Sequence, residues 1–400
     1  MTLRWLAAAA AAGLVLLLTL TPSGSSPEGV GRCMLCNPRL MADVADNVAL
    51  FVPFGLSLSL LGLSAAVAAA LGASLSGVIE LLQSWVPGRD ATLVDFVANT
   101  IGAGLGAWAM PSVQRWRSAP VAHDGRSLIA AALACMTWIA TGALIAPSWT
   151  ASDYWGQWTP VLDSIEPYKG KVLAARVGEM AVPSHRISDS AGLRATLAAR
   201  APVRVEVLIG PPPIRVSSIF SIADAEARRV LLVGASGHDL IIRYRSRAAD
   251  WTLDQPALRI AGALERLAPG DRTTIVITRR TDDYCARVGE EETCGLGFGA
   301  GDGWSLLLSS VRIPPDWRVR LGFLWMSALV APVGFFARGD RRTTIALAAI
   351  AACLLWLPGI TELRPTRIYE WVGVAAGLAG AALLARAVRQ RSDAALPMVS

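Results

Sequence analysis

The feature that most constrains this chain is a series of apolar runs, most of them long enough to cross a lipid bilayer. A helix rises about 1.5 Å per residue, so a hydrocarbon core of about 30 Å needs about 20 apolar residues. The runs are Leu6–Leu20, 47–84, Thr92–Met110, Ser127–Ala146, Leu321–Phe336, Thr343–Leu357 and Ile368–Ala385. With 53% hydrophobic residues and a mean hydropathy of +0.45, an ordinary soluble protein is excluded. The sequence predicts an integral membrane protein surrounded by the lipid bilayer.

Eight spans follow if residues 47–84 hold two helices joined by a tight turn near Gly62. Arginines then gather at one end of the spans: Arg115, Arg117, Arg126, Arg338, Arg341, Arg342, Arg386, Arg389 and Arg391. The positive-inside rule places these arginines and both termini in the cytoplasm. The other arginines lie mainly in one large soluble segment, so topology explains the net charge of +6 better than a nucleic-acid partner, and none is expected. The small residues after Leu20 fit a cleaved signal peptide or a retained first helix, and we favour the retained helix.

Residues 147–316 differ from the rest of the chain, because hydropathy falls and short alternating runs begin. The expected strands are Val203–Ile209, Ile214–Ile222, Arg229–Gly234, Asp239–Ser246, Ala257–Ala263, Thr273–Arg279 and Trp304–Ser309. Regular short strands of this kind predict an all-β sandwich or jelly roll, which the topology places outside the membrane. Tyr154, Trp155 and Trp158 precede these strands and are interpreted as residues of the membrane interface.

The stretch from Asp46 to Trp108 is apolar but carries polar side chains that lipid tolerates only when they are paired or line a cavity. These residues form a predicted polar cluster: Asp46, Asn47, Glu80, Gln83, Arg89, Asp95 and Asn99. Glu80 and Gln83 share one helix face, as do Asp95 and Asn99. One interpretation is a structural lock in which Arg89 neutralises an acid. The other is a pocket for a polar or anionic head group, in which crowded carboxyls favour acid–base chemistry.

The ordered motifs of this stretch resemble the VanZ-like family of bacterial membrane proteins. They are Asp46-Asn47, Leu50 to Gly55, Ser76 to Gln83, Gly88-Arg89, and the set Asp95, Asn99 and Gly102. The resemblance implies a bacterial inner, or cytoplasmic, membrane and an association with tolerance to glycopeptide antibiotics. It implies no particular reaction. Gly102, Gly104 and Gly106 follow the polar motif and predict close helix packing.

The strand order of the outer domain resembles laminin-G-like or concanavalin-A-like sandwiches. The resemblance covers 172–310 and includes the runs RVEVLIGPPP, RRVLLVG and DLIIRYRSRA. It implies a module that binds carbohydrate or protein. The acidic run Glu290 to Glu292 is expected to be solvated on a hairpin turn rather than to serve a glycosidase.

The cysteines fall into three pairs. Cys285 and Cys294 flank the expected hairpin at Gly289, so a disulfide is predicted in an oxidising compartment. Cys33 and Cys36 form a CxxC in the first outer loop, for which a passive disulfide or an idle pair is favoured over redox chemistry. Cys135 and Cys353 lie inside apolar spans and are expected to be packing residues. No metal or cofactor motif is present in the sequence, and none is expected.

The predicted architecture is therefore a multi-domain membrane protein, a helical bundle with an all-β sandwich. Its predicted parts are an N-terminal anchor helix and outer loop (1–46), a VanZ-like transmembrane domain (47–146), the sandwich (147–316), and C-terminal helices with a cytoplasmic tail (317–400). Two functions remain open. The first is a non-enzymatic envelope protein whose sandwich binds a glycan or another envelope component. The second is a membrane-embedded enzyme or carrier that acts on a polar or lipid-linked envelope molecule at Glu80, Arg89 and Asp95.

Overall fold

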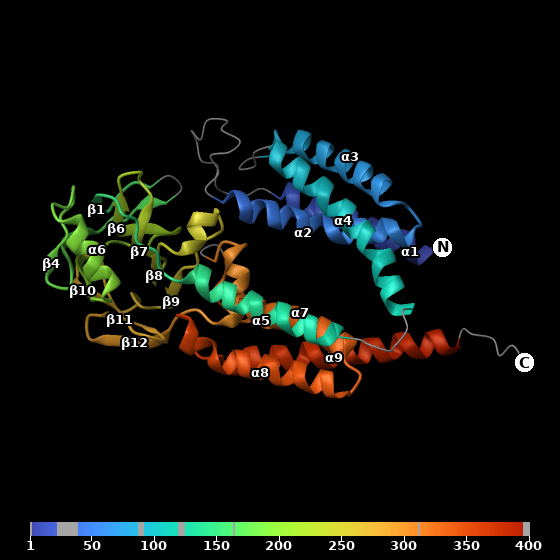
Figure 1. Cartoon of the computed structure of the whole chain (residues 1–400). Helices are drawn as coiled ribbons and strands as arrows, with labels where there is room; N and C mark the ends of the chain where they lie inside the picture. The colour runs from blue at the N-terminus through green and yellow to red at the C-terminus, as the bar shows by residue number, and fades with distance from the viewer. Residues whose placement is uncertain are drawn as a thin grey trace, which may run out of the picture. The chain divides into compact units, whose positions relative to one another are not determined.

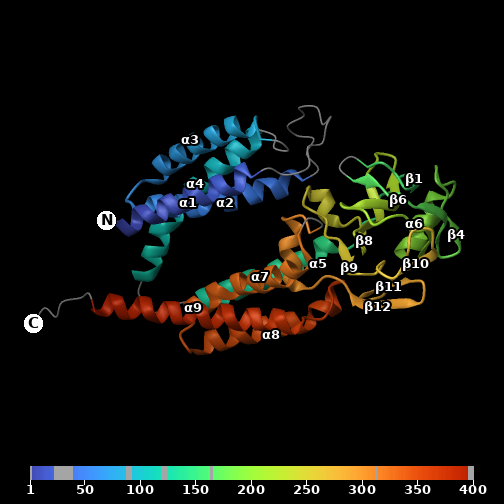
Figure 2. The same cartoon turned by 180° about the vertical axis from the view of Figure 1, so that it is seen from behind.

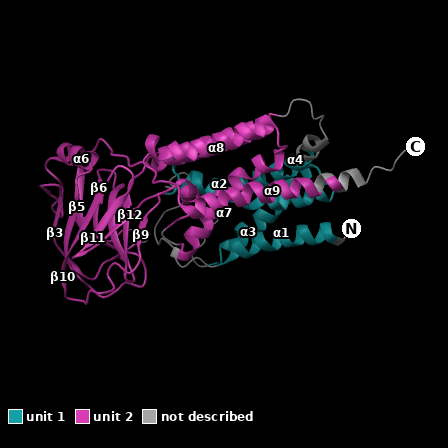
Figure 3. Ribbon diagram, turned by 90° about the horizontal axis from the view of Figure 1, so that it is seen from below, with its two compact units in different colours: residues 1–122, 251–254 teal, residues 123–250, 255–400 magenta. Residues whose placement is uncertain are grey.

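The structure is a computed structural model that describes residues 2–21, 39–86, 92–118, 125–162, 165–310 and 313–394. The chain divides into two compact units, which Figure 3 colours separately. Unit 1 holds residues 1–122 and 251–254, and unit 2 holds residues 123–250 and 255–400. Within the described residues, eight helices are long and apolar enough to cross a membrane, which confirms the predicted spans.

Unit 1 is a helical bundle (Figure 1). Its helices are α1 (Thr2–Leu20), α2 (Leu40–Leu60), α3 (Ala65–Gln83) and α4 (Leu93–Ser118). The turn between α2 and α3 lies where the sequence predicts it: Gly62 has a φ of +88°, and the Ser64 hydroxyl caps α3 by accepting the N–H of Val67 at 3.3 Å.

Helix α2 begins earlier than the sequence indicates, so Asp46 and Asn47 lie inside it rather than before it. The reason is an N-terminal cap from the segment 251–254. The Thr252 hydroxyl and carbonyl accept the N–H groups of Met41 and Ala42 at 3.1 and 3.4 Å, and Asp254 pairs with Arg39 at 3.2 Å. These contacts satisfy backbone donors that a helix N-terminus otherwise leaves unpaired.

The helices of unit 2 run side by side, with the β domain at one end of them (Figures 1 and 2). They are α5 (Arg126–Ile145), α7 (Pro315–Phe336), α8 (Arg341–Ile360) and α9 (Ile368–Ala394). Helix α5 packs on α7 and α8.

The β domain of unit 2 is a sandwich of two six-stranded sheets. Sheet one has the order β1-β6-β7-β8-β9, with β2 also paired to β6, and sheet two has the order β12-β11-β10-β5-β3-β4. The strands are β1 (Tyr154–Trp158), β2 (Glu166–Pro167), β3 (Lys171–Val177), β4 (Met180–Ala181), β5 (Val203–Leu208), β6 (Ser217–Asp224), β7 (Arg229–Ser236), β8 (Asp239–Tyr244), β9 (Leu258–Ile260), β10 (Arg272–Arg279), β11 (Tyr284–Val288) and β12 (Glu291–Leu296). Alternate residues of both sheets, such as Val205 and Ile242, fill one core. A short helix, α6 (Ser190–Ala198), packs on β3.

Two sequence interpretations of this domain are wrong. The predicted strand Trp304–Ser309 is instead the end of a 3-10 helix, η3 (Ala300–Leu306), followed by irregular chain. Tyr154 is not a membrane-interface residue: it is fully buried in the core of the sandwich, and Trp158 packs against the same core. Both aromatic residues lie on β1, an edge strand of sheet one.

Candidate functional site

Within unit 1 the predicted polar cluster is organised by helix α4, which contacts both α2 and α3. The Asn47 amide of α2 donates to the Asp95 carboxylate of α4 at 2.7 Å. The Asn99 amide, one turn further along α4, donates to the Ser76 hydroxyl of α3 at 2.9 Å. Each bond joins a different pair of helices, so α4 is fixed in register with two neighbours.

Glu80 and Gln83 leave α3 on one face but bond to different partners. The Glu80 carboxylate accepts the backbone N–H of Thr92 at 2.8 Å, where α4 begins. The Thr92 hydroxyl in turn accepts the N–H of Asp95 at 3.0 Å and caps the helix. The Gln83 amide donates to the Thr19 carbonyl of α1 at 3.0 Å. Glu80 therefore lies at the positive end of the α4 dipole, while Gln83 ties α1 to α3.

Two residues of the cluster, Asn99 and Asp46, are not fully described by one hydrogen bond to one partner. Asn99 is 1% exposed, and within the described residues its Oδ1 atom is buried without a hydrogen-bond partner. Asp46 is half-buried, with Arg39, Asp43 and Asp254 as its electrostatic neighbours. Arg89, together with the CxxC pair Cys33 and Cys36, lies outside the described residues.

Glycines allow the helices that bear the cluster to approach closely. A Cβ atom at Gly102 or Gly106 would overlap the carbonyl oxygen of Val48 or Val52 on α2. Gly104 faces α3 instead, where a Cβ would lie 3.4 Å from the Ala69 methyl group. The predicted small-residue surface is therefore two-sided, with Gly102 and Gly106 against α2.

Sequence reasoning missed the hydrogen-bonding roles of Thr19, Ser76 and Thr92, because their partners depend on how each helix is rotated. It also missed a buried network in unit 2. Glu370 is fully buried at the start of α9 and pairs with Arg364 at 3.3 Å, and Arg364 lies 3.5 Å from Asp302. The available signal was a carboxylate within an otherwise apolar run, which indicates a buried partner.

The network fixes the glycine-rich segment before α7. The Glu370 carboxylate accepts the N–H groups of Gly301 and Arg367 at 2.8 and 2.6 Å. Burial lowers the pKa of Arg364, but the carboxylates of Glu370 and Asp302 outweigh it and raise the pKa above its usual value. Arg364 therefore stays positively charged, and it lies within ion-pair distance of both Glu370 and Asp302.

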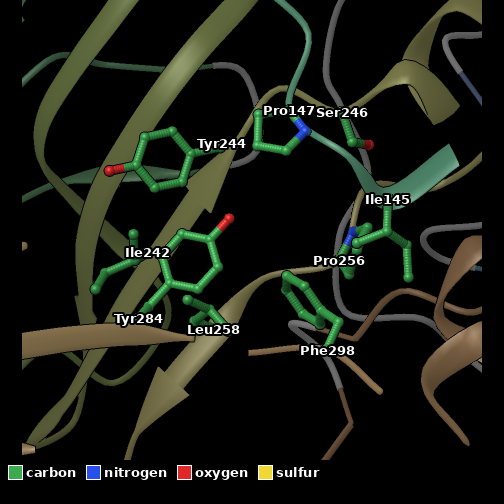
Figure 4. A pocket seen from close by; sticks show the side chains of 9 residues that line it. All are labelled: Ile145, Pro147, Ile242, Tyr244, Ser246, Pro256, Leu258, Tyr284 and Phe298. Carbon is green, nitrogen blue, oxygen red and sulfur yellow. The ribbon is translucent and has the colours of Figure 1, made fainter. Parts of the chain in front are cut away.

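A small cavity lies where α5 meets the sandwich (Figure 4). Its lining includes the rings of Tyr244, Tyr284 and Phe298, and its volume of about 10 Å³ is room for about one water molecule. Burial raises the pKa of Tyr284 to about 12, so its phenol is neutral at physiological pH. The cavity is too small for an organic ligand.

The predicted hairpin of the outer domain is present. Strands β11 and β12 pair around a turn at Gly289, whose φ is +61°, and a disulfide joins Cys285 to Cys294. Glu290, Glu291 and Glu292 are exposed on this hairpin, and Glu291 pairs with Arg266. Cys135 and Cys353 are free thiols on α5 and α8.

Comparison with known proteins identifies one part of the chain. Residues 9–114 match the VanZ/LLP1 family model, which covers α2, α3 and most of α1 and α4. Searches of curated proteins and of solved structures give no match. The matched segment includes every residue of the polar cluster. The membrane-spanning part of unit 1 is thus a VanZ-like domain.

Proposed function

We propose that this chain is a multi-pass protein of the bacterial inner membrane whose sandwich lies outside the membrane and binds a carbohydrate or another envelope component. The observation that carries the proposal is the insertion of a complete sandwich, with a core and a disulfide of its own, between the spans α5 and α7. The VanZ-like domain would anchor or sense the bound component, which extends the proposal to envelope or glycopeptide tolerance.

Two observations favour the outer location of the sandwich. Disulfides persist in oxidising compartments, and the sandwich contains one. In unit 2, the spans carry Arg126, Arg341 and Arg386 toward the ends remote from the sandwich. Arginines flank the cytoplasmic ends of membrane spans, so both termini would lie in the cytoplasm.

The polar contacts of unit 1 fit a structural lock better than a catalytic site. Asn47, Gln83 and Asn99 each bond to another helix, as a structural lock requires. In sheet two of the sandwich, by contrast, β5 and β10 alternate between residues buried in the core and more exposed residues that face outward.

Thiol labelling in intact cells tests the location. Ile214 is 100% exposed in a loop of the sandwich, so we expect Ile214→Cys to react fully with a membrane-impermeant maleimide. The background would carry Cys33→Ser and Cys36→Ser to remove other outer thiols. Arg341→Cys, at the start of α8, is the matched control and should react only after the membrane is permeabilised. Protection of Ile214→Cys in intact cells, with labelling of Arg341→Cys, would reverse the proposed topology.

A further inference from the structure

The outer surface of sheet two carries a row of exposed arginines. Strand registers align Arg176 of β3, Arg204 of β5, Val276 of β10 and Arg287 of β11 side by side. Glu292 of β12 follows Arg287 at the end of the row. All four charged side chains are exposed. Figure 3 labels the five strands that the row crosses.

The alternation of buried and exposed residues along the strands shows that the side chains of this row lie on the outer face of the sheet. Val203, Val205 and Val207 of β5 are buried in the core, so the residues between them face outward. The same pattern holds for β10, where Ile275 and Ile277 are buried on either side of Val276. The arginines therefore share one open face of the sandwich.

The charges of the row are poorly compensated. Arg176 and Arg204 stand directly opposite each other, an arrangement that destabilises a strand pair. They share one carboxylate, Glu179, at 4.0 and 3.9 Å, and that carboxylate is 88% exposed. Within the described residues, Arg287 makes no ion pair. A solvated pair of this kind stabilises a fold by less than about 1 kcal/mol.

We propose that this face, which we name the arginine face (Arg176, Arg204 and Arg287), binds an anionic envelope polymer through repeated phosphate or carboxylate groups. The guanidinium fork matches either group with two parallel hydrogen bonds. Strands lie about 4.8 Å apart, so the row spans about 14 Å from β3 to β11. A single small anion cannot bridge that distance, whereas a polymer that crosses the strands can. This inference rests on the proposed envelope-binding function and assigns it a surface and a ligand chemistry.

The test measures binding of the detergent-purified full chain to fluorescent polyphosphate and polygalacturonate, with neutral dextran and inorganic phosphate as comparisons. We expect salt-dependent binding to at least one polyanion. The triple variant R176Q/R204Q/R287Q should lose affinity roughly tenfold or more. The control R186Q/R215Q/R247Q removes the same charge from exposed arginines elsewhere in unit 2 and should stay within about twofold of the unmodified chain. Equal thermal stability of both variants would show that folding is unchanged.

The outcomes separate the two proposals. Preference for polyphosphate or for polygalacturonate supports the arginine face and identifies the anion. Equal losses in both triple variants, or binding of inorganic phosphate as tight as that of the polymers, would overturn it. If R176Q/R204Q/R287Q still sediments with insoluble envelope glycan as the unmodified chain does, the arginine face is refuted while the proposed function stands. If the unmodified chain does not sediment with the glycan, the proposed function is refuted, and the arginine face, which rests on it, is refuted with it.

Discussion

Gly106→Val is expected to unfold the VanZ-like domain, because the new side chain has no space between α4 and α2. A Cβ atom at this position would overlap the Val52 carbonyl oxygen and lie 2.9 Å from the Leu56 backbone nitrogen. Both atoms belong to the helix backbone, so relief requires the helices to separate. We expect a loss of about 3 kcal/mol or more, which thermal unfolding in detergent would measure.

Gly104→Ala is the matched control on the same helix. The added methyl group would lie 3.4 Å from the Ala69 side chain, which is ordinary contact, and alanine favours the helix by up to about 1 kcal/mol. We expect unchanged or slightly raised stability. If Gly106→Ala and Gly104→Ala had the same effect, the close α2–α4 approach would be wrong.

Glu370→Ala should destabilise unit 2 by about 3–5 kcal/mol, because Arg364 would remain buried without its principal counter-charge. The Arg364 side chain is 5% exposed, and the backbone N–H groups of Gly301 and Arg367 would lose their acceptor. The expected result is a lower thermal-unfolding midpoint of the purified protein than that of the unmodified chain. Unchanged stability would contradict the buried network.

Two further variants separate charge imbalance from lost packing. Arg364→Met combined with Glu370→Gln removes both charges and should recover much of the loss. Asp153→Ala breaks an exposed pair with Arg186 and should cost less than about 1 kcal/mol. A double variant as unstable as Glu370→Ala would assign the effect to packing instead.

Hydropathy predicted the membrane spans because each depends only on a local run of apolar residues, as α8 and α9 illustrate. Alternation predicted β5 and β10, and a continuous apolar run predicted β7, for the same reason. The local sequence pattern gave a wrong prediction at β1, the edge strand of sheet one. Tyr154 and Trp158 follow the span α5 closely in sequence, as membrane-interface residues do, but they pack in or against the sandwich core. The local pattern also failed at Trp304, because the contact of Glu370 with Gly301 is non-local.

The membership of the polar cluster could be read from sequence, but its pairing could not. Asn47 and Asp95 are 48 residues apart and meet only because glycines bring α2 and α4 together. Helix rotation decides that Gln83 turns to α1 while Glu80 turns to α4. The predicted role of Arg89 stays a prediction, since it lies outside the described residues.

Sedimentation with envelope material tests most directly whether this protein is an envelope-binding protein. The purified full chain in detergent would be mixed with insoluble bacterial envelope glycan and centrifuged, beside an unrelated helical membrane protein in the same detergent. We expect this chain to enter the pellet saturably and to be released by soluble fragments of the glycan, while the unrelated protein stays in the supernatant. Recovery of this chain in the supernatant at every glycan concentration would contradict the proposed function.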